Sequence, residues 1–92
     1  MTRRTGVDDA DAQRAADRLA VDFDAVEFDR EQFRMGLVRE LQHGRADPDT
    51  NVTDDDLVVT AKIALAHLNE IPDYYTRLAA MEADAREYWK RQ

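Results

Sequence analysis

Apolar residues recur every three or four positions along most of this 92-residue chain. Such spacing brings them to one face of an α-helix, whereas a half-buried strand would alternate apolar with polar residues. The pattern favours an all-α fold, a compact bundle of about four helices. We predict these helices at approximately residues 9–20, 30–43, 54–70 and 73–89.

Helix-start and helix-stop residues indicate the bounds of these segments. Asp29 can cap the second helix, and Gln32 three residues later fits a capping box. Gly44 is expected to end this helix, because glycine readily takes the left-handed conformation found just after helices. Thr53, which precedes three aspartates, is the expected cap of the third helix, and Pro72 stops that helix.

Residues 21–29 do not show the helical spacing and partly alternate apolar with polar residues. The chain offers no second strand with which this segment could pair, and a lone strand is not stable. We therefore predict an irregular or single-turn linker, with Phe23, Val26 and Phe28 packed into the core.

An apolar stripe runs along the predicted fourth helix. Such a stripe is typical of a helix that faces a core. Trp89, near the end of the same helix, is expected to pack at an end of the chain. The members of the stripe are Tyr74, Leu78, Met81, Ala85 and Tyr88.

Length and composition describe one small domain spanning residues 1–92, with a frayed N-terminus at residues 1–7. The chain is acidic, with a formal charge of −7 and no segregated basic stripe, which argues against nucleic-acid binding. No segment holds the roughly 18 apolar residues of a membrane span, and no signal peptide is visible. Because the chain also lacks cysteine, we expect a cytoplasmic protein.

The two histidines each have a glutamate three residues away, as Glu40–His43 and His67–Glu70. Residues three apart share a helix face, so each pair can offer a carboxylate and an imidazole together. Two such pairs could bind a transition metal such as iron, manganese or zinc in a helical bundle. In a simple antiparallel hairpin, however, His43 and His67 would lie roughly 20 Å apart.

A structural interpretation of these residues competes with the metal site. Glu40 lies beside the core stripe, where an unpaired carboxylate would be costly, so some group should satisfy it. In this interpretation Glu40 and His43 bond to neighbouring arginine or backbone groups, while His67 packs against Tyr74 or Tyr75. A third interpretation gives Glu70 or His67 a role in proton transfer.

Nucleophile motifs, phosphate-binding glycine loops and dinucleotide fingerprints are all missing from the sequence. We therefore expect a non-enzymatic accessory or protein-interaction module that binds a protein partner or itself. Tyrosine is favoured at protein interfaces, and one of the two adjacent tyrosines after Pro72 is expected to be core. The predicted interaction surface consists of Tyr74, Tyr75, Asp73 and Lys62.

Several short motifs over residues 33–78 resemble an uncharacterised family of small helical proteins from bacteria, archaea and phages, domain of unknown function 5661. The resemblance implies a compact helical protein and a mobile-element or phage connection, and it supplies no activity. The family often has a second glutamate where this chain has Gln42, which removes one acidic ligand from any metal site. The motifs are Phe33–Leu37, Glu40, His43–Gly44, Thr50–Thr53, Asp55–Asp56, Lys62–Glu70 and Pro72–Leu78, and the implied signature includes Glu40, His43, Lys62, His67, Glu70 and Asp73.

Overall fold

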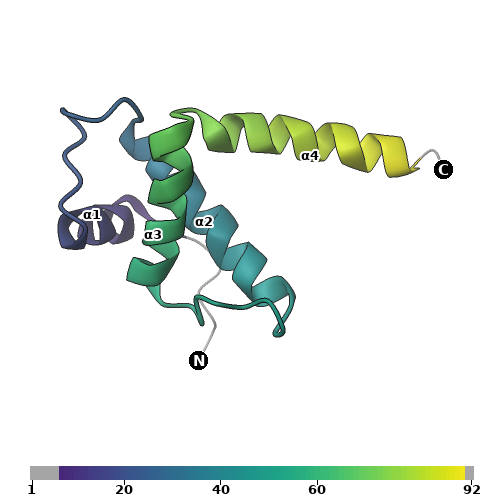
Figure 1. Ribbon diagram of the computed structural model, residues 1–92, viewed down its shortest axis with the longest axis horizontal. Helices are drawn as coiled ribbons and strands as arrows, with labels where there is room; N and C mark the ends of the chain where they lie inside the picture. Colours follow the sequence, from purple (N-terminus) through teal and green to yellow (C-terminus); the bar gives the residue numbers. More distant parts are fainter. Residues whose placement is uncertain (1–6, 91–92) are drawn as a thin grey trace.

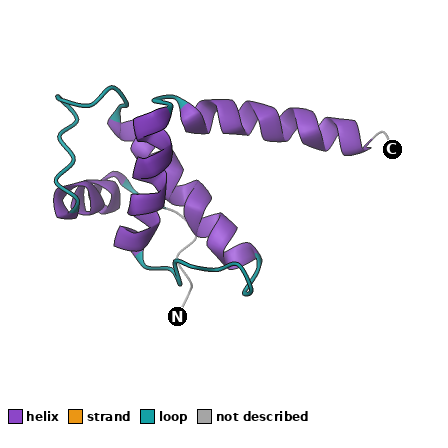
Figure 2. Ribbon diagram, viewed as in Figure 1, coloured by secondary structure: helices purple, strands orange, loops and turns teal. Residues whose placement is uncertain are grey.

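The computed structural model describes residues 7–90, and every regular element in this range is a helix (Figures 1 and 2). The predicted all-α fold of four helices is confirmed. Residues 47–56, between α2 and α3, and residues 19–29, between α1 and α2, form loops and turns. The helices are α1 (Asp9–Arg18), α2 (Arg30–Ala46), α3 (Leu57–Glu70) and α4 (Tyr74–Lys90).

Side chains of the core come mainly from α1, α2 and α3, which contact one another. Large residues of α2 fill the centre, and alanines of α1 and α3 face them, which lets the three helices approach closely. The buried apolar residues of α2 are Phe33, Leu37 and Leu41, and those facing them are Ala12, Ala15, Ala16, Ala61, Ala64 and Leu68.

The start of α3 differs from the prediction. Asp56 caps the helix by accepting a hydrogen bond from the Val59 backbone N–H at 3.0 Å. Thr53 is instead buried, and its hydroxyl donates to Asn51 Oδ1 at 3.3 Å. Asp54 and Asp55 have positive φ angles of 49° and 64°, so the chain turns once more before the helix can begin.

The end of α2 also differs, because the helix continues through Gly44 to Ala46. The expected left-handed turn at this glycine is therefore wrong. A Cβ at Gly44 would lie 2.7 Å from Thr53 Oγ1 and 2.9 Å from Asn51 Oδ1. Glycine is required here because the loop between α2 and α3 lies directly against the helix.

The other predictions at the start of α2 are partly confirmed. Asp29 caps the helix and accepts the Gln32 backbone N–H at 2.8 Å. The Gln32 side chain does not close a capping box, because its Oε1 accepts no hydrogen bond from Asp29, while its Nε2 donates to Thr76 Oγ1 of α4 at 2.5 Å. Before the cap, the predicted irregular linker is confirmed, with the rings of Phe23 and Phe28 6.2 Å apart and packed near Phe33.

Val7 is 4% exposed, and its carbonyl accepts a hydrogen bond from Arg34 Nη1 at 3.1 Å. The predicted frayed segment therefore does not include Val7, because a core contact and an arginine of α2 hold it. The rest of that prediction, residues 1–6, lies outside the described residues.

Helix α4 extends away from the other three helices (Figure 1). Its first two turns contact α2, and Glu82 forms an ion pair with Arg39 of α2. From Met81 onward the large apolar residues face solvent, with Met81 57%, Tyr88 56% and Trp89 70% exposed. The expected packing of Trp89 is therefore wrong, and we call residues 81–90 the α4 arm.

Helix α4 is 17 residues long. Neither it nor any other helix within residues 7–90 combines the length and the apolar character that crossing a membrane requires.

Candidate functional site

A buried hydrogen bond joins α4 to α2 next to the core. The Tyr75 hydroxyl donates to Glu40 Oε2 at 2.8 Å. Tyr75 is 1% exposed and the Glu40 side chain 11% exposed. Burial, together with the hydrogen bond to the carboxylate, raises the pKa of Tyr75 far above its ordinary value. The phenol therefore stays neutral and remains a donor to Glu40.

His67 of α3 also contacts Glu40 and the two tyrosines. Its Nε2 lies 3.8 Å from Glu40 Oε2. Its ring stacks on Tyr74 at 4.3 Å between centroids with 2° between the planes, and it meets the edge of Tyr75 at 6.3 Å. The predicted packing of His67 on the tyrosines is confirmed, whereas Glu40 bonds to a tyrosine hydroxyl in place of the expected arginine or backbone group.

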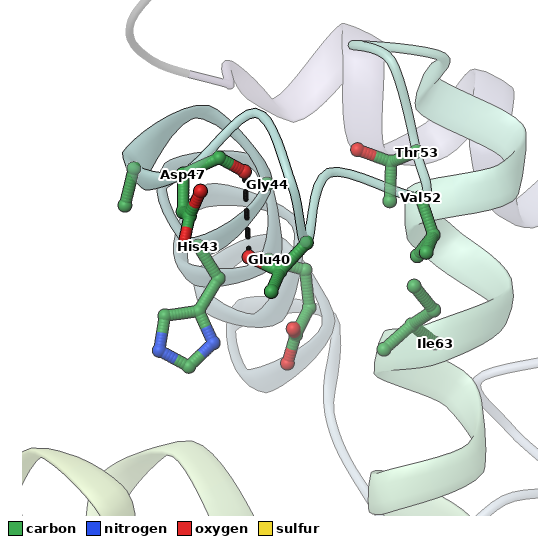
Figure 3. Close-up of a pocket in the computed structure, with 9 residues that line it drawn as sticks. Glu40, His43, Gly44, Asp47, Val52, Thr53 and Ile63 are labelled. Carbon is green, nitrogen blue, oxygen red and sulfur yellow. Dashed lines mark hydrogen bonds between the residues drawn. The ribbon is translucent and has the colours of Figure 1, made fainter.

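A cavity of about 340 Å³ opens beside this cluster, between the last turns of α2, the following loop and α3 (Figure 3). A hydrogen bond closes a turn within this loop, in which Thr50 Oγ1 donates to the Asp47 carbonyl at 3.3 Å. In Figure 3 the His43 imidazole extends away from Ile63, which lines the opposite wall. The cavity is lined by Glu40, His43, Asp47, Thr53, Val52 and Ile63, among others.

The structure brings together only part of the predicted metal site. Glu40 and His67 face each other, and His43 lines the cavity with Glu40, while Glu70 is exposed at the last position of α3. Among residues 7–90, no three His, Asp or Glu side chains are grouped so that they could hold a metal ion. The geometric support for the metal hypothesis is therefore one carboxylate–imidazole pair.

The predicted interaction surface separates into accessible and buried residues. Lys62 and Asp73 are exposed, and Asp73 accepts from Arg77 Nε at 2.7 Å. Tyr74 is half-buried under its stacking contact with His67. Tyr75 belongs to the core, so its ring is not part of an accessible surface.

Sequence reasoning missed the α4 arm as a surface. It identified the stripe that includes Met81 and Tyr88 and interpreted this stripe as core-facing. The spacing of the stripe gave no signal of this exposure, because it is the same at the packed residues Tyr74 and Leu78 and at the exposed residues Met81 and Tyr88.

Four helices, a Glu–Tyr–His cluster where α2, α3 and α4 meet, and a projecting arm define a small all-α protein. A family model described as "Protein of unknown function (DUF5661)" matches residues 12–84. The chain belongs to this family. No curated protein and no solved structure matches the chain. The family match ends inside the arm, so Tyr88 and Trp89 lie beyond it.

Proposed function

We propose that this protein is a non-enzymatic interaction module whose binding surface is the α4 arm. The observation that carries the proposal is the exposure of Met81, Tyr88 and Trp89 on one short helical segment, at 57%, 56% and 70%. Contiguous exposed apolar side chains mark interaction sites more often than isolated ones do. Methionine, tyrosine and tryptophan are also enriched at protein interfaces.

The arm is supported as a binding surface by the contacts at its base. Tyr75 is bonded to Glu40, and Glu82 pairs with Arg39, so two contacts orient α4 on α2. A helix held in this way presents its apolar residues in one arrangement before a partner arrives, which reduces the entropy lost on binding. The sequence-based connection to mobile elements or phages adds no partner to this proposal.

A photo-cross-linking residue at position 88, in cells that make the protein, tests the proposal. We expect a discrete adduct, because a bound partner covers Tyr88, and we expect Met81→Glu in the same chain to remove it. Val52 is the matched control position, since it is 77% exposed but lies in the loop before α3. Equal or weaker cross-linking at position 88 than at position 52 would contradict the proposal, and the adduct is identified by mass spectrometry.

A second candidate function is transition-metal binding, for which the observation is the 3.8 Å separation of Glu40 Oε2 and His67 Nε2. A carboxylate and a neutral imidazole are suitable ligands for iron, manganese or zinc. If this function holds, protein purified without a histidine tag carries close to one equivalent of metal. Added metal then raises the melting temperature, because it binds the folded state.

The control for metal binding is His67→Asn, which removes one ligand, compared with His43→Asn on the cavity wall. A metal content below about a tenth of an equivalent, with no thermal shift on adding metal, rules the function out.

A further inference from the structure

The turn just before α3 has an unusual backbone. Asp54 and Asp55 have φ angles of 49° and 64°, and the Asp56 N–H donates to the Thr53 carbonyl at 2.9 Å across them. Left-handed backbone brings the Cβ of an L-residue close to the following carbonyl, so residues other than glycine adopt it at a cost in free energy. Tight turns with two left-handed central residues usually have glycine at the second. Other contacts must therefore hold this turn closed.

The same residues also carry the signals of a helix start. Thr53 is a favourable N-cap, and the three aspartates after it would place negative charge at the positive end of the helix dipole. Asp56 would then stand at the third helical position, where an aspartate can complete a capping box. Asp11 does this in α1, which Asp8 caps. An α3 that begins at Asp54 is thus nearly one turn longer and has no left-handed residue at its start.

Contacts with α2 hold the closed turn in place of this longer helix. Arg45 Nε donates to Asp55 Oδ1 at 2.7 Å, and the two side chains are only 16% and 28% exposed. Thr53 is buried, with its hydroxyl close to Gly44. A right-handed helix requires a different φ at Asp55, which redirects its carboxylate away from Arg45. The Arg45 contact and the longer helix therefore exclude each other.

We propose that this turn is a conformational switch that sets the length of α3. In the closed form, which the structure shows, Arg45 binds Asp55 and α3 begins at Leu57. In the extended form the three aspartates join α3, and Thr53 caps it. The closed form has the buried contacts and the costly backbone, whereas the extended form has the unstrained backbone and the stronger cap. This switch is independent of the α4 arm.

Extension of α3 would also open the cavity beside Glu40. Val52 and Thr53 line this cavity of about 340 Å³ (Figure 3), and both move when α3 takes up the turn. Residues 47–53 remain as the connection and can span up to ~23 Å, more than the ~10 Å between packed helix axes. The chain is therefore long enough for the change. A ligand that binds one form more tightly shifts the equilibrium toward that form.

Amide hydrogen exchange of the purified full chain, followed by NMR, distinguishes the two forms. In the closed form the N–H groups of Leu57 and Val58 lie in the first turn of α3, where they have no intrahelical acceptor. In the extended form they donate to the carbonyls of Thr53 and Asp54. Slower exchange at these two amides therefore reports the extended form.

Arg45→Met tests the switch, because it removes the contact that holds the closed turn. If the closed population falls to about a third, exchange at Leu57 and Val58 slows about threefold. The Thr60 amide is the internal reference, because its N–H donates to the Asp56 carbonyl at 2.9 Å and keeps this bond in both forms.

Asp54 offers a matched pair of variants, since Asp54→Ala and Asp54→Gly remove the same carboxylate and leave the Arg45–Asp55 contact in place. Alanine disfavours left-handed backbone and favours helix, whereas glycine does the reverse. We expect Asp54→Ala to slow exchange at Leu57 and Val58, and Asp54→Gly to leave it at least as fast as in the wild type.

Arg39→Met is the control for losing an arginine of α2, because Arg39 pairs with α4 and not with the loop. It should leave exchange at Leu57 and Val58 unchanged. Unchanged or faster exchange at these amides in Arg45→Met, relative to Thr60, overturns the switch. So does equal exchange in Asp54→Ala and Asp54→Gly. Circular dichroism checks that each variant keeps its helices.

Discussion

Replacing Tyr75 with alanine is expected to lower the free energy of unfolding by about 3–5 kcal/mol, the usual cost of removing a large buried aromatic ring. The ring is 1% exposed and lies at the contact of α2, α3 and α4. Tyr88→Ala is the matched control, because Tyr88 is 56% exposed on the same helix and should change stability by less than about 0.5 kcal/mol. Chemical denaturation followed by circular dichroism measures both, and equal effects of the two substitutions would show that the ring contributes no core packing.

The hydroxyl of Tyr75 contributes separately from its ring. Tyr75→Phe keeps the ring but leaves Glu40 without its donor, and we expect a loss of about 1–3 kcal/mol. The pKa of Tyr75 is raised in the folded state above its ordinary 10.0. Its contribution is therefore complete below about pH 10 and is lost as the pH rises toward the folded-state pKa, since only the unfolded chain ionises there. The stability of the wild type should thus fall more steeply above pH 10 than that of Tyr75→Phe.

Gly36→Leu is expected to lower the free energy of unfolding by about 3 kcal/mol, the upper part of the usual range for overpacking. A Cβ at Gly36 would lie 2.5 Å from Tyr75 Cε2 and 3.0 Å from the Ala64 Cβ. A larger side chain must push α4 and α3 away from α2. Ala80→Leu, at an exposed position of α4, is the control for adding an apolar side chain to a helix surface.

A double-mutant cycle shows whether the ring of Tyr75 is the obstacle. Gly36→Ala in the wild type combines an overpacking cost with a helix-propensity gain of about 1 kcal/mol. In the Tyr75→Ala background the nearest obstacle is gone and only the Ala64 Cβ remains close, so the same substitution should cost less than in the wild type. Additive effects in the two backgrounds would mean that Tyr75 does not limit the space at Gly36.

The sequence predicted the helices and the need for a partner at Glu40, but not the identity of that partner. The periodicity placed Glu40 beside the core stripe, and a buried carboxylate requires a hydrogen-bond donor. The donor is Tyr75, 35 residues away, and it reaches Glu40 because α4 crosses α2 at Gly36. Crossing positions depend on packing in three dimensions, which spacing along one helix does not contain.

Helix bounds were wrong where several residues could serve as a cap. Thr53 and Asp56 are both good N-cap residues, and local chemistry alone does not choose between them. The choice follows from a distant contact, because Thr53 is buried against Gly44 and so lies outside the helix. Similarly, the stripe of α4 has one pattern throughout, and that pattern does not tell whether the covering surface belongs to the same chain.

The contact of Tyr75 with Gly36 and Glu40 fixes the angle at which α4 leaves α2, and a small change of this angle moves the far end of the helix by several ångströms. From Tyr75 to Trp89 the helix rises about 21 Å, so a tilt of roughly 10° at this contact carries the indole through about 4 Å. The direction in which the tip points thus depends on Gly36, on the Tyr75–Glu40 hydrogen bond and on the Arg39–Glu82 ion pair. A substitution at Gly36, Tyr75 or Glu40 that tilts α4 therefore moves Trp89 without contacting it.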